Sequence, residues 1–231
     1  MSKNTSVWLI IPQTNLHVGN ESVANFSVID KAVQRDVVTG IPCINSSSLK
    51  GALKEYLTRE EPIAKDEIRR LFGSVKNEKA DKDIKKDDTQ KGSAMFFDAS
   101  LIAIPRPCNG DKPYEIVYCD KVIDEFIARA TALHAVCDKN KLTDGKVRVE
   151  YDVFRSLCDN ESLPIIARNC LENGESVNLW YEQVVPSKSV FATLIMTDGP
   201  TDLDILNDKD KIVQIGANAT IGYGYCMMMK L

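Results

Sequence analysis

The sequence predicts an α+β fold in which β-strands dominate. Three observations lead to this prediction. Apolar runs of strand length recur along the chain, and the first covers residues 5–12 (TSVWLIIP). Two segments carry apolar residues at helical spacing. The pair Asn173-Gly174 lies between two extended runs, a pattern typical of a β-hairpin. We find no linker and no internal repeat, so we expect one domain over residues 1–231.

The first half of the chain predicts a strand, a long loop and a helix. The strand at 5–12 ends at a proline, and residues 13–36 are polar and contain glycine. A turn at 37–42 leads to Asn45-Ser46-Ser47-Ser48, a helix-start signal. Gly51 lies inside this helix, where glycine costs ~1 kcal/mol relative to alanine. That cost suggests close approach by another backbone or a ligand, or tight packing.

The second half of the chain predicts further strands, one more long helix and the hairpin. Residues 76–91 are almost wholly polar and predict a mobile surface insertion. Asp120 is expected to cap the second helix. The hairpin arms fall at 163–167 and 177–185, and a short helix is expected at 202–207. The other strands are predicted at 94–105 (one strand or a pair), 115–119, 146–153, 189–196, 211–215 and 223–229.

Composition excludes several classes of protein. The chain has 44% hydrophobic and 27% charged residues, as soluble globular proteins do. No apolar run approaches the ~20 residues of a membrane helix, so no membrane partner is predicted. The start of the chain lacks signal-peptide features, which predicts a cytoplasmic protein. The seven cysteines include no CxxC pair, which disfavours a metal site or a disulfide framework. The net charge of −4 argues against binding nucleic acid by bulk charge but allows a local basic groove.

Three segments could carry function. In the first, a loop with His17 and Asp30 leads to the helix start at 46–51, where backbone N–H groups, Lys50 and Arg35 could bind phosphate. Composition alone favours simple capping there. The second is the glycine-rich turn 215–225, which could approach a sugar-phosphate chain closely or be only a turn. The third is the hairpin, either a wedge between bases or a meander with a core Trp180.

The order of these pieces resembles a known family. The run His17-Val18-Gly19, Asp30, Gln34-Arg35-Asp36, Thr39-Gly40-Ile41-Pro42 and Ser47-Ser48-Leu49-Lys50-Gly51 is similar to the N-terminal signature of the RAMP proteins (repeat-associated mysterious proteins) of type III CRISPR systems. Leu71-Phe72-Gly73-Ser74, the phrases at 94–98, 163–169 and 178–186, and the glycine-rich end also resemble it. The matches run from residue 8 to 226 and are nearest to the Cmr-type backbone subunit of III-B complexes.

The resemblance implies a ferredoxin-like, RRM-like palm with loop insertions and a protruding hairpin thumb at 163–186. Copies of such a subunit stack along a CRISPR guide RNA with other effector subunits, and each thumb displaces one base pair of the guide–target duplex. It implies that Asp30 is required for cutting the complementary target RNA, and His17 and Glu182 are further catalytic candidates. The candidate RNA-binding residues are Arg35, Ser47, Ser48, Lys50, Gly51, Lys54, Arg168, Asn169, Trp180, Gly216, Thr220, Gly222 and Gly224.

The expected chemistry is attack by the target's own 2′-hydroxyl on the adjacent phosphate. Asp30 would accept the proton or hold a hydrated divalent cation, expected to be Mg²⁺ and not held in a permanent protein site. The sequence departs from the family pattern at residues 24–27 and 45–46, at Val184 and at Ala217. Two alternatives stay open: a catalytically silent structural RNA-binding subunit, and a guide-processing ribonuclease of the same superfamily that uses His17.

Overall fold

A computed structural model describes residues 3–19, 29–60, 63–74, 90–199, 202–208 and 210–231. The polar insertion predicted at 76–91 lies outside these ranges except for its last two residues. The described strands of the main sheet are β1 (Asn4–Pro12), β2 (Cys43–Ile44), β3 (Met95–Phe96), β4 (Ala99–Pro107), β5 (Tyr114–Tyr118), β6 (Val147–Arg148), β9 (Val190–Thr197), β10 (Ile212–Gln214) and β11 (Tyr225–Lys230). The helices are α1 (Ser46–Arg59), α2 (Lys65–Phe72), α3 (Asp120–Ala132), α4 (Lys139–Thr143), α5 (Tyr151–Cys158), and the 3₁₀ turns η1 (Asp202–Asn207) and η2 (Ala219–Ile221).

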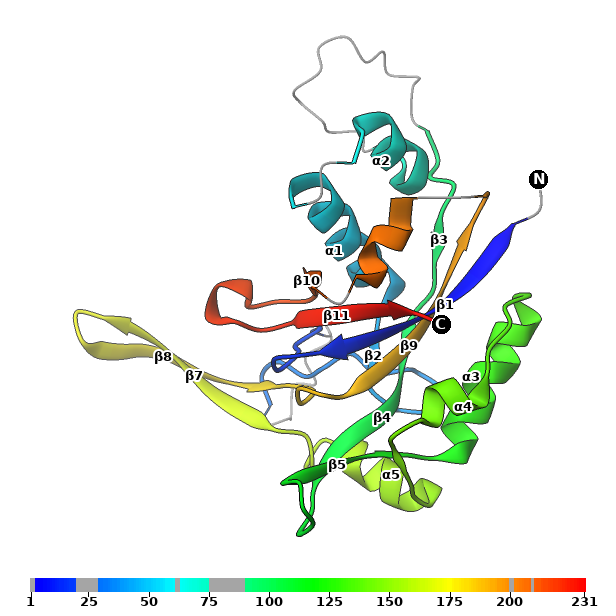
Figure 1. The fold of residues 1–231 in the computed structure, drawn as a ribbon. Coiled ribbons are helices and arrows are strands. Elements are labelled where there is room, and N and C mark those ends of the chain that lie inside the picture. The colour runs from blue at the N-terminus through cyan, green and yellow to red at the C-terminus, as the bar shows by residue number, and fades with distance from the viewer. Residues whose placement is uncertain (1–2, 20–28, 61–62, 75–89, 200–201, 209) are drawn as a thin grey trace.

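The centre of the sheet has the ferredoxin-like strand order. Strands run β10-β11-β1-β9-β4-β5-β6, and the four central strands pair antiparallel. Taken in chain order, β1, β4, β9 and β11 are the first to fourth strands, so their order across the sheet is fourth, first, third, second. Helix α1 connects the first to the second, and η1 lies between the third and the fourth. The predicted α+β, ferredoxin-like fold is therefore confirmed (Figure 1).

The sheet buries apolar side chains on both faces. Successive side chains of a strand point to opposite faces, so Trp8 and Ile10 of β1 join one core cluster while Val7 and Leu9 join the other. The first cluster packs under α1, α2 and η1, and the second packs under α3 and α4. In Figure 1, these two sets of helices lie on opposite sides of the sheet. Strand β1, buried on both faces, therefore reads as the unbroken apolar run seen in the sequence.

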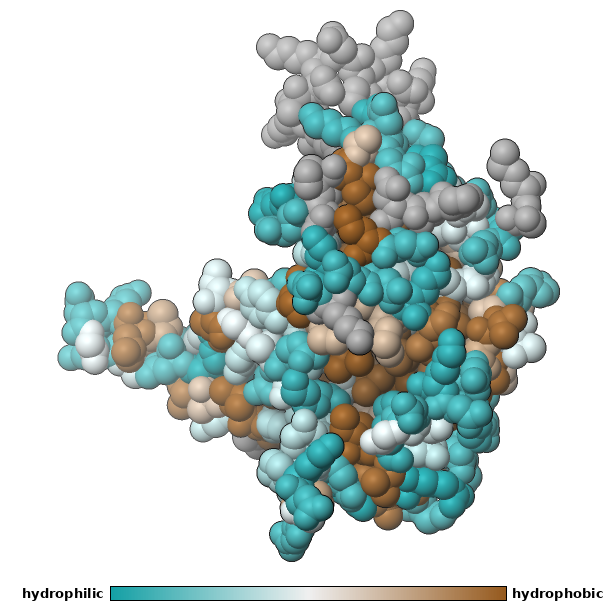
Figure 2. Space-filling view, viewed as in Figure 1, coloured by the Kyte–Doolittle hydropathy of each residue, from teal (hydrophilic) through white to brown (hydrophobic). Residues whose placement is uncertain are grey.

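Strands β7 (Ile165–Glu172) and β8 (Glu175–Gln183) form a separate two-stranded hairpin. Its turn is Asn173-Gly174, and both residues have positive φ, at 53° and 87°, as the sequence pattern predicts. The hairpin extends from the sheet as an arm (Figure 1), and its outer part carries apolar side chains among hydrophilic ones (Figure 2). Leu171 and Leu179 are 61% and 54% exposed. This arm has no apolar core of its own beyond its base.

Two local predictions were wrong. The strand expected at 146–153 is only the two-residue β6, because helix α5 begins at Tyr151 and buries Phe154 and Cys158 at helical spacing. Asp120 does not cap α3. It is the first helical residue, Cys119 occupies the N-cap position, and the Asp120 carboxylate pairs with Lys139 and Arg148. Among the described residues, no helix is long and apolar enough to cross a membrane.

Candidate nucleic-acid interface and catalytic loop

Asp30 is fastened to the base of the hairpin. Its Oδ2 accepts a hydrogen bond from the Tyr181 backbone N–H at 2.7 Å, and its own N–H donates to the Tyr181 carbonyl at 3.0 Å. The next residue repeats the clamp, because the Lys31 N–H donates to the same carbonyl at 3.1 Å and its carbonyl accepts from the Gln183 N–H at 2.9 Å. Asp30 remains exposed to solvent. An acidic side chain is thus held in a defined place at the surface, where the arm leaves the body.

Behind this exposed carboxylate lies a buried polar cluster. The Glu182 side chain is 1% exposed and contacts three groups. Arg168 Nη1 and Asn218 Nδ2 donate to its two oxygens at 3.1 and 2.9 Å, and His17 Nε2 lies 3.4 Å from Oε1. The cluster joins the first loop, both hairpin strands and the glycine-rich turn. Sequence reasoning singled out Glu182 and His17 separately, and the fold brings them together from 165 positions apart.

One nitrogen of the His17 ring is a hydrogen-bond donor. His17 Nδ1 lies 2.7 Å from the Gln183 carbonyl, which can only accept, so Nδ1 must donate. The other nitrogen, Nε2, faces the Glu182 carboxylate. Both side chains are buried, at 3% and 1% exposure. Neither side chain can touch an RNA in this conformation.

The glycine-rich turn packs directly against the His17 loop. A Cβ on Gly216 would clash with the His17 carbonyl oxygen, and the Ala217 N–H donates to that oxygen at 2.9 Å. Gly216 has φ +86°, a conformation that glycine adopts without strain. A Cβ on Gly224 would clash with the Ile215 carbonyl oxygen. At these two glycines the close approach is therefore to the chain's own backbone.

Two cations lie close to the ring of Trp180. Lys31 Nζ lies 5.2 Å from the ring centroid and Arg168 Cζ lies 5.4 Å from it. This ring is partly exposed, so the reading of Trp180 as a core residue does not hold. Trp180 Nε1 is buried and has no hydrogen-bond partner among the described residues. A positively charged aromatic platform therefore lies beside Asp30, suited to nucleic acid by charge and by stacking.

Helix α1 begins with a protein carboxylate at its N-terminus. Asp98 Oδ1 accepts from the Ser46 N–H at 2.6 Å, whereas Asn45, at the N-cap position, makes no side-chain bond to the helix. Asp98 thus takes one of the backbone donors expected to bind phosphate. Ser47 and Gly51 are exposed one turn apart on α1, and a Cβ on Gly51 would meet nothing within 4 Å. Tight packing within the described chain therefore does not explain this glycine.

Arg35 forms hydrogen bonds that stabilise its own loop. Its Nη1 donates to the carbonyls of Gly40 and Cys158 at 2.8 and 2.7 Å, and burial lowers its pKa. Its Nε and Nη2 are also buried and have no partner among the described residues. The guanidinium therefore braces the 36–40 turn against the end of α5. The bidentate phosphate contact expected from the sequence would need this bracket to open.

The remaining sequence candidates lie on the surface around these elements. Lys50 and Lys54 are partly exposed on α1, four residues apart. Asn169 lies on β7 and its Oδ1 accepts from Ser176 across the hairpin at 2.7 Å. Thr220 and Gly222 are exposed at the tip of the glycine-rich turn. Ser48 lies on α1 and is partly buried.

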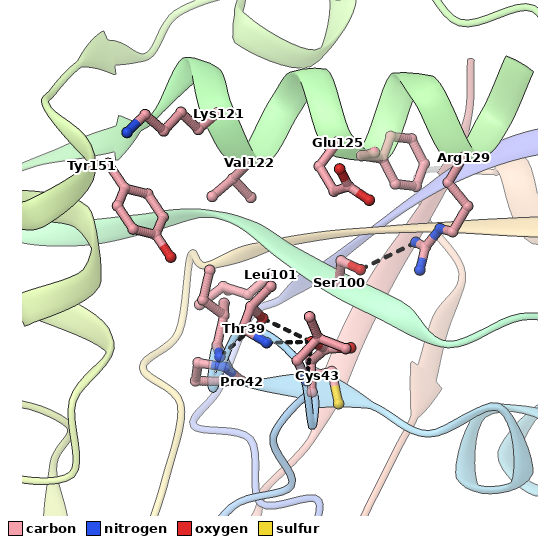
Figure 3. A pocket seen from close by; sticks show the side chains of 14 residues that line it. Thr39, Pro42, Cys43, Ser100, Leu101, Lys121, Val122, Glu125, Arg129 and Tyr151 are labelled. Carbon is pink, nitrogen blue, oxygen red and sulfur yellow. Dashed lines mark hydrogen bonds between the residues drawn. The ribbon is translucent and has the colours of Figure 1, made fainter.

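A cavity of about 550 Å³ lies away from this constellation. It separates α3 from the 36–43 segment and the start of β4, and Arg129 bonds Ser100 at 3.1 Å in its wall (Figure 3). Lys121, Glu125 and Tyr151 also line it (Figure 3). It contains none of the predicted catalytic or RNA-binding residues. Its two basic and two acidic side chains balance, so its charge points to no ligand class.

Sequence reasoning missed three contributors to the site. Lys31 follows Asp30 directly, Asn218 holds Glu182, and Tyr181 supplies the backbone clamp. Adjacency to Asp30 could have drawn attention to Lys31. Asn218 has φ +67°, a conformation in which asparagine is enriched, and it lies in the glycine-rich turn that the sequence did mark. The described residues include no group of three or more acidic, histidine or cysteine side chains arranged to hold a metal ion.

Comparison with known proteins agrees with the fold. The chain is 27% identical to the CRISPR system Cmr endoribonuclease Cmr4 of Pyrococcus furiosus, over 92% of this chain and 90% of the relative. It is 34% identical to the CRISPR system Cms endoribonuclease Csm3 of Streptococcus thermophilus, over 51% of this chain and 54% of the relative.

Solved structures show the same architecture. A type III-B Cmr-beta complex bound to cognate target RNA contains a chain that superposes with a TM-score of 0.76 at 22% identity, covering 98% of this chain and 97% of that one. Oligomeric Cmr4 from Pyrococcus furiosus gives 0.68 at 19% identity, covering 98% of each. The RAMP superfamily model matches residues 10–227, nearly the whole chain. The protein therefore belongs to the RAMP superfamily.

Proposed function

We propose that this protein is a repeated backbone subunit of a type III CRISPR effector complex, and that it cleaves target RNA bound to the guide. The single observation that carries the proposal is the exposed Asp30 carboxylate, fixed at the base of the protruding hairpin by the Tyr181 backbone. Family membership and relatives named as CRISPR endoribonucleases support it. A surface carboxylate clamped by three neighbouring backbone bonds is preorganised for chemistry.

The partners follow from the surface. A chain of net charge −4 needs a local basic site to bind RNA, and the Lys31–Trp180–Arg168 stack supplies one. The exposed apolar side chains of the hairpin, such as Leu171 and Leu179, suit insertion between bases or contact with a neighbouring subunit. Relatives of the same fold are seen as oligomers and in complexes with target RNA. We infer guide RNA, target RNA, further copies of this chain and other effector subunits as partners.

The bond-forming step uses the target's own 2′-hydroxyl and one base. The hairpin would unstack one nucleotide and turn its 2′-hydroxyl in line with the adjacent phosphorus. Asp30 accepts the 2′-hydroxyl proton while the O2′–P bond forms and the P–O5′ bond breaks. The leaving 5′-oxygen takes a proton, from water in the simplest case, so the products are a 2′,3′-cyclic phosphate and a 5′-hydroxyl. The buried cluster around Glu182 holds Tyr181 in place, and Tyr181 holds Asp30.

A divalent cation fits beside Asp30 only as a shared ion. One carboxylate provides too few ligands for a protein cage, whereas Mg²⁺ commonly binds one or two carboxylates and completes its shell with water and phosphate. Asp30 is the residue that would hold it. When bound, such an ion supplies charge stabilisation at the phosphate.

Substitution of Asp30 tests the proposal. Asp30→Asn keeps an oxygen that can accept from the Tyr181 N–H but removes the base, so assembly should persist and cleavage should slow ~100-fold or more. Asp111→Asn, an exposed aspartate on the β4–β5 turn, is the matched control and should cut normally. The measurement is single-turnover cleavage of a labelled target by the reconstituted complex. Wild-type rates from Asp30→Asn would leave a structural RNA-binding subunit, in which Asp30 merely caps the Tyr181 N–H.

A target with 2′-deoxyribose at the cut positions tests the attacking group. The wild-type complex should bind this target and leave it intact, because the nucleophile is absent. Cleavage of the deoxy target would retain Asp30 as a functional group but reject attack by the 2′-hydroxyl.

A further inference from the structure

The clamp on Tyr181 holds a cation, Lys31, next to Asp30. Its backbone N–H and C=O are hydrogen-bonded to Tyr181 and Gln183, so these bonds fix its main chain against β8. Its ammonium lies 5.2 Å from the Trp180 ring centroid. The Asp30 carboxylate bonds the N–H of Tyr181, the next residue of β8. An acid and a base are thus placed against two consecutive residues of one strand.

The second cation near Trp180, Arg168, is already paired with a carboxylate. Arg168 donates to the buried carboxylate of Glu182 at 3.1 Å, and that bond compensates the buried charge. No carboxylate pairs with the Lys31 ammonium in the part of the chain that the structure describes. Lys31 is exposed, so its charge is available to a phosphate. A lysine ammonium is also a proton donor, whereas a guanidinium holds its protons too tightly to give one up.

We propose that Lys31 is a second catalytic residue, which donates a proton to the leaving 5′-oxygen of the scissile phosphate. The proposal rests on the proposed function, with Asp30 as the base. In-line displacement separates the entering and leaving oxygens on opposite sides of phosphorus, so one residue cannot serve both. The Asp30 carboxylate bonds the Tyr181 N–H, whereas the Lys31 ammonium lies over the ring of Trp180, so the two groups are held at separate points of one strand. Asp30 and Lys31 can therefore address the two oxygens of one phosphate.

The proton inventory balances without any further reactant. The 2′-hydroxyl gives its proton to Asp30 as the O2′–P bond forms. The P–O5′ bond breaks, and the electron pair stays on the 5′-oxygen, which takes a proton from the Lys31 ammonium. Water then returns a proton to the Lys31 amine and removes one from Asp30. Trp180 keeps the ammonium over its ring between turnovers, so the side chain is preorganised.

A sulfur-substituted target separates this role from simple phosphate binding. In a 5′-bridging phosphorothiolate, the leaving thiolate needs no protonation. Lys31→Ala should cut the normal target ~100-fold more slowly and cut the thiolate target at nearly the wild-type rate. Lys31→Arg keeps the charge over Trp180 but is a poor acid, so it should bind normally and show the same rescue. Lys112→Ala, an exposed lysine on the β4–β5 turn, should match the wild type on both targets.

The outcomes are distinguishable from those of the Asp30 test. Asp30→Asn should stay slow on both targets, because its missing base acts on the 2′-hydroxyl. If Lys31→Ala and Lys31→Arg cut the normal target at the wild-type rate, or are slowed equally on both targets, Lys31 is not the acid. Should Lys31→Ala fail to assemble, Lys31→Arg decides by the same comparison. Wild-type cleavage by Asp30→Asn would instead reject the proposed function itself.

Discussion

Removing the buried Glu182 carboxylate should destabilise the protein far more than neutralising it. Glu182→Ala deprives two donors, Arg168 Nη1 and Asn218 Nδ2, of their acceptor, and it removes the carboxylate that His17 Nε2 faces. The first two can turn to water, because Arg168 is 23% exposed at its side chain and Asn218 is partly exposed. His17 is 3% exposed and cannot. The result is one enclosed unpartnered ring nitrogen and a cavity where the side chain was.

The magnitude follows from these contacts. A buried unsatisfied polar group costs about 1–3 kcal/mol, and breaking a buried ion pair costs about 3–5 kcal/mol. Solvation of Arg168 discounts the second figure, so we expect a loss of about 3 kcal/mol for Glu182→Ala. At ~2–4 °C per kcal/mol for a chain of this size, Tm should fall by roughly 6–12 °C. Glu182→Gln has the same shape. With its oxygen at the Oε1 position it can still accept from Asn218, and its amide meets Arg168, which can turn to water, so it should lose about 1 kcal/mol.

Urea unfolding of the isolated protein, followed by circular dichroism, measures both variants. Equal stability of Glu182→Ala and the wild type, or an equal loss for the alanine and glutamine variants, would refute the account of the cluster. Cleavage by the glutamine variant then separates two roles. If Glu182 only positions Tyr181 and Asp30, Glu182→Gln should cut at nearly the wild-type rate. If Glu182 transfers a proton, that variant should fold normally and cut slowly.

Two glycines give opposite expectations. Gly51→Ala should stabilise the isolated protein by about 0.5–1 kcal/mol, because the added Cβ meets nothing within 4 Å and favours the helix. A bulky Gly51→Leu should block guide-dependent assembly in sedimentation, and normal assembly would mean that nothing docks there. Gly216→Ala should destabilise by more than the ~1–3 kcal/mol of a strained backbone, because its Cβ would clash with the His17 carbonyl. Gly222→Ala, with φ +83° and open space, should show the backbone strain alone, and equal losses would argue against the clash.

Patterns between residues close in sequence predicted most elements of the fold. The apolar run at 5–12 became β1, and Asn173-Gly174 became the hairpin turn, because the side-chain period and turn chemistry are local properties. The strand expected at 146–153 failed for a local reason as well. Its first residues alternate, but the next turn buries Phe154 and Cys158 at helical spacing, and packing of that face decided the structure.

The sequence by itself determined the α+β class, the core strands, the hairpin and the candidate aspartate in its polar loop. Only the tertiary structure decided what surrounds that aspartate. The Tyr181 clamp joins residues 151 positions apart, the His17–Glu182 contact joins residues 165 apart, and Asp98 caps a helix that starts 52 residues earlier. Such pairs leave no periodic trace in the chain. Hydrogen bonds between distant segments form only after the sheet has folded and excluded water, and that burial makes each unpaired polar group costly.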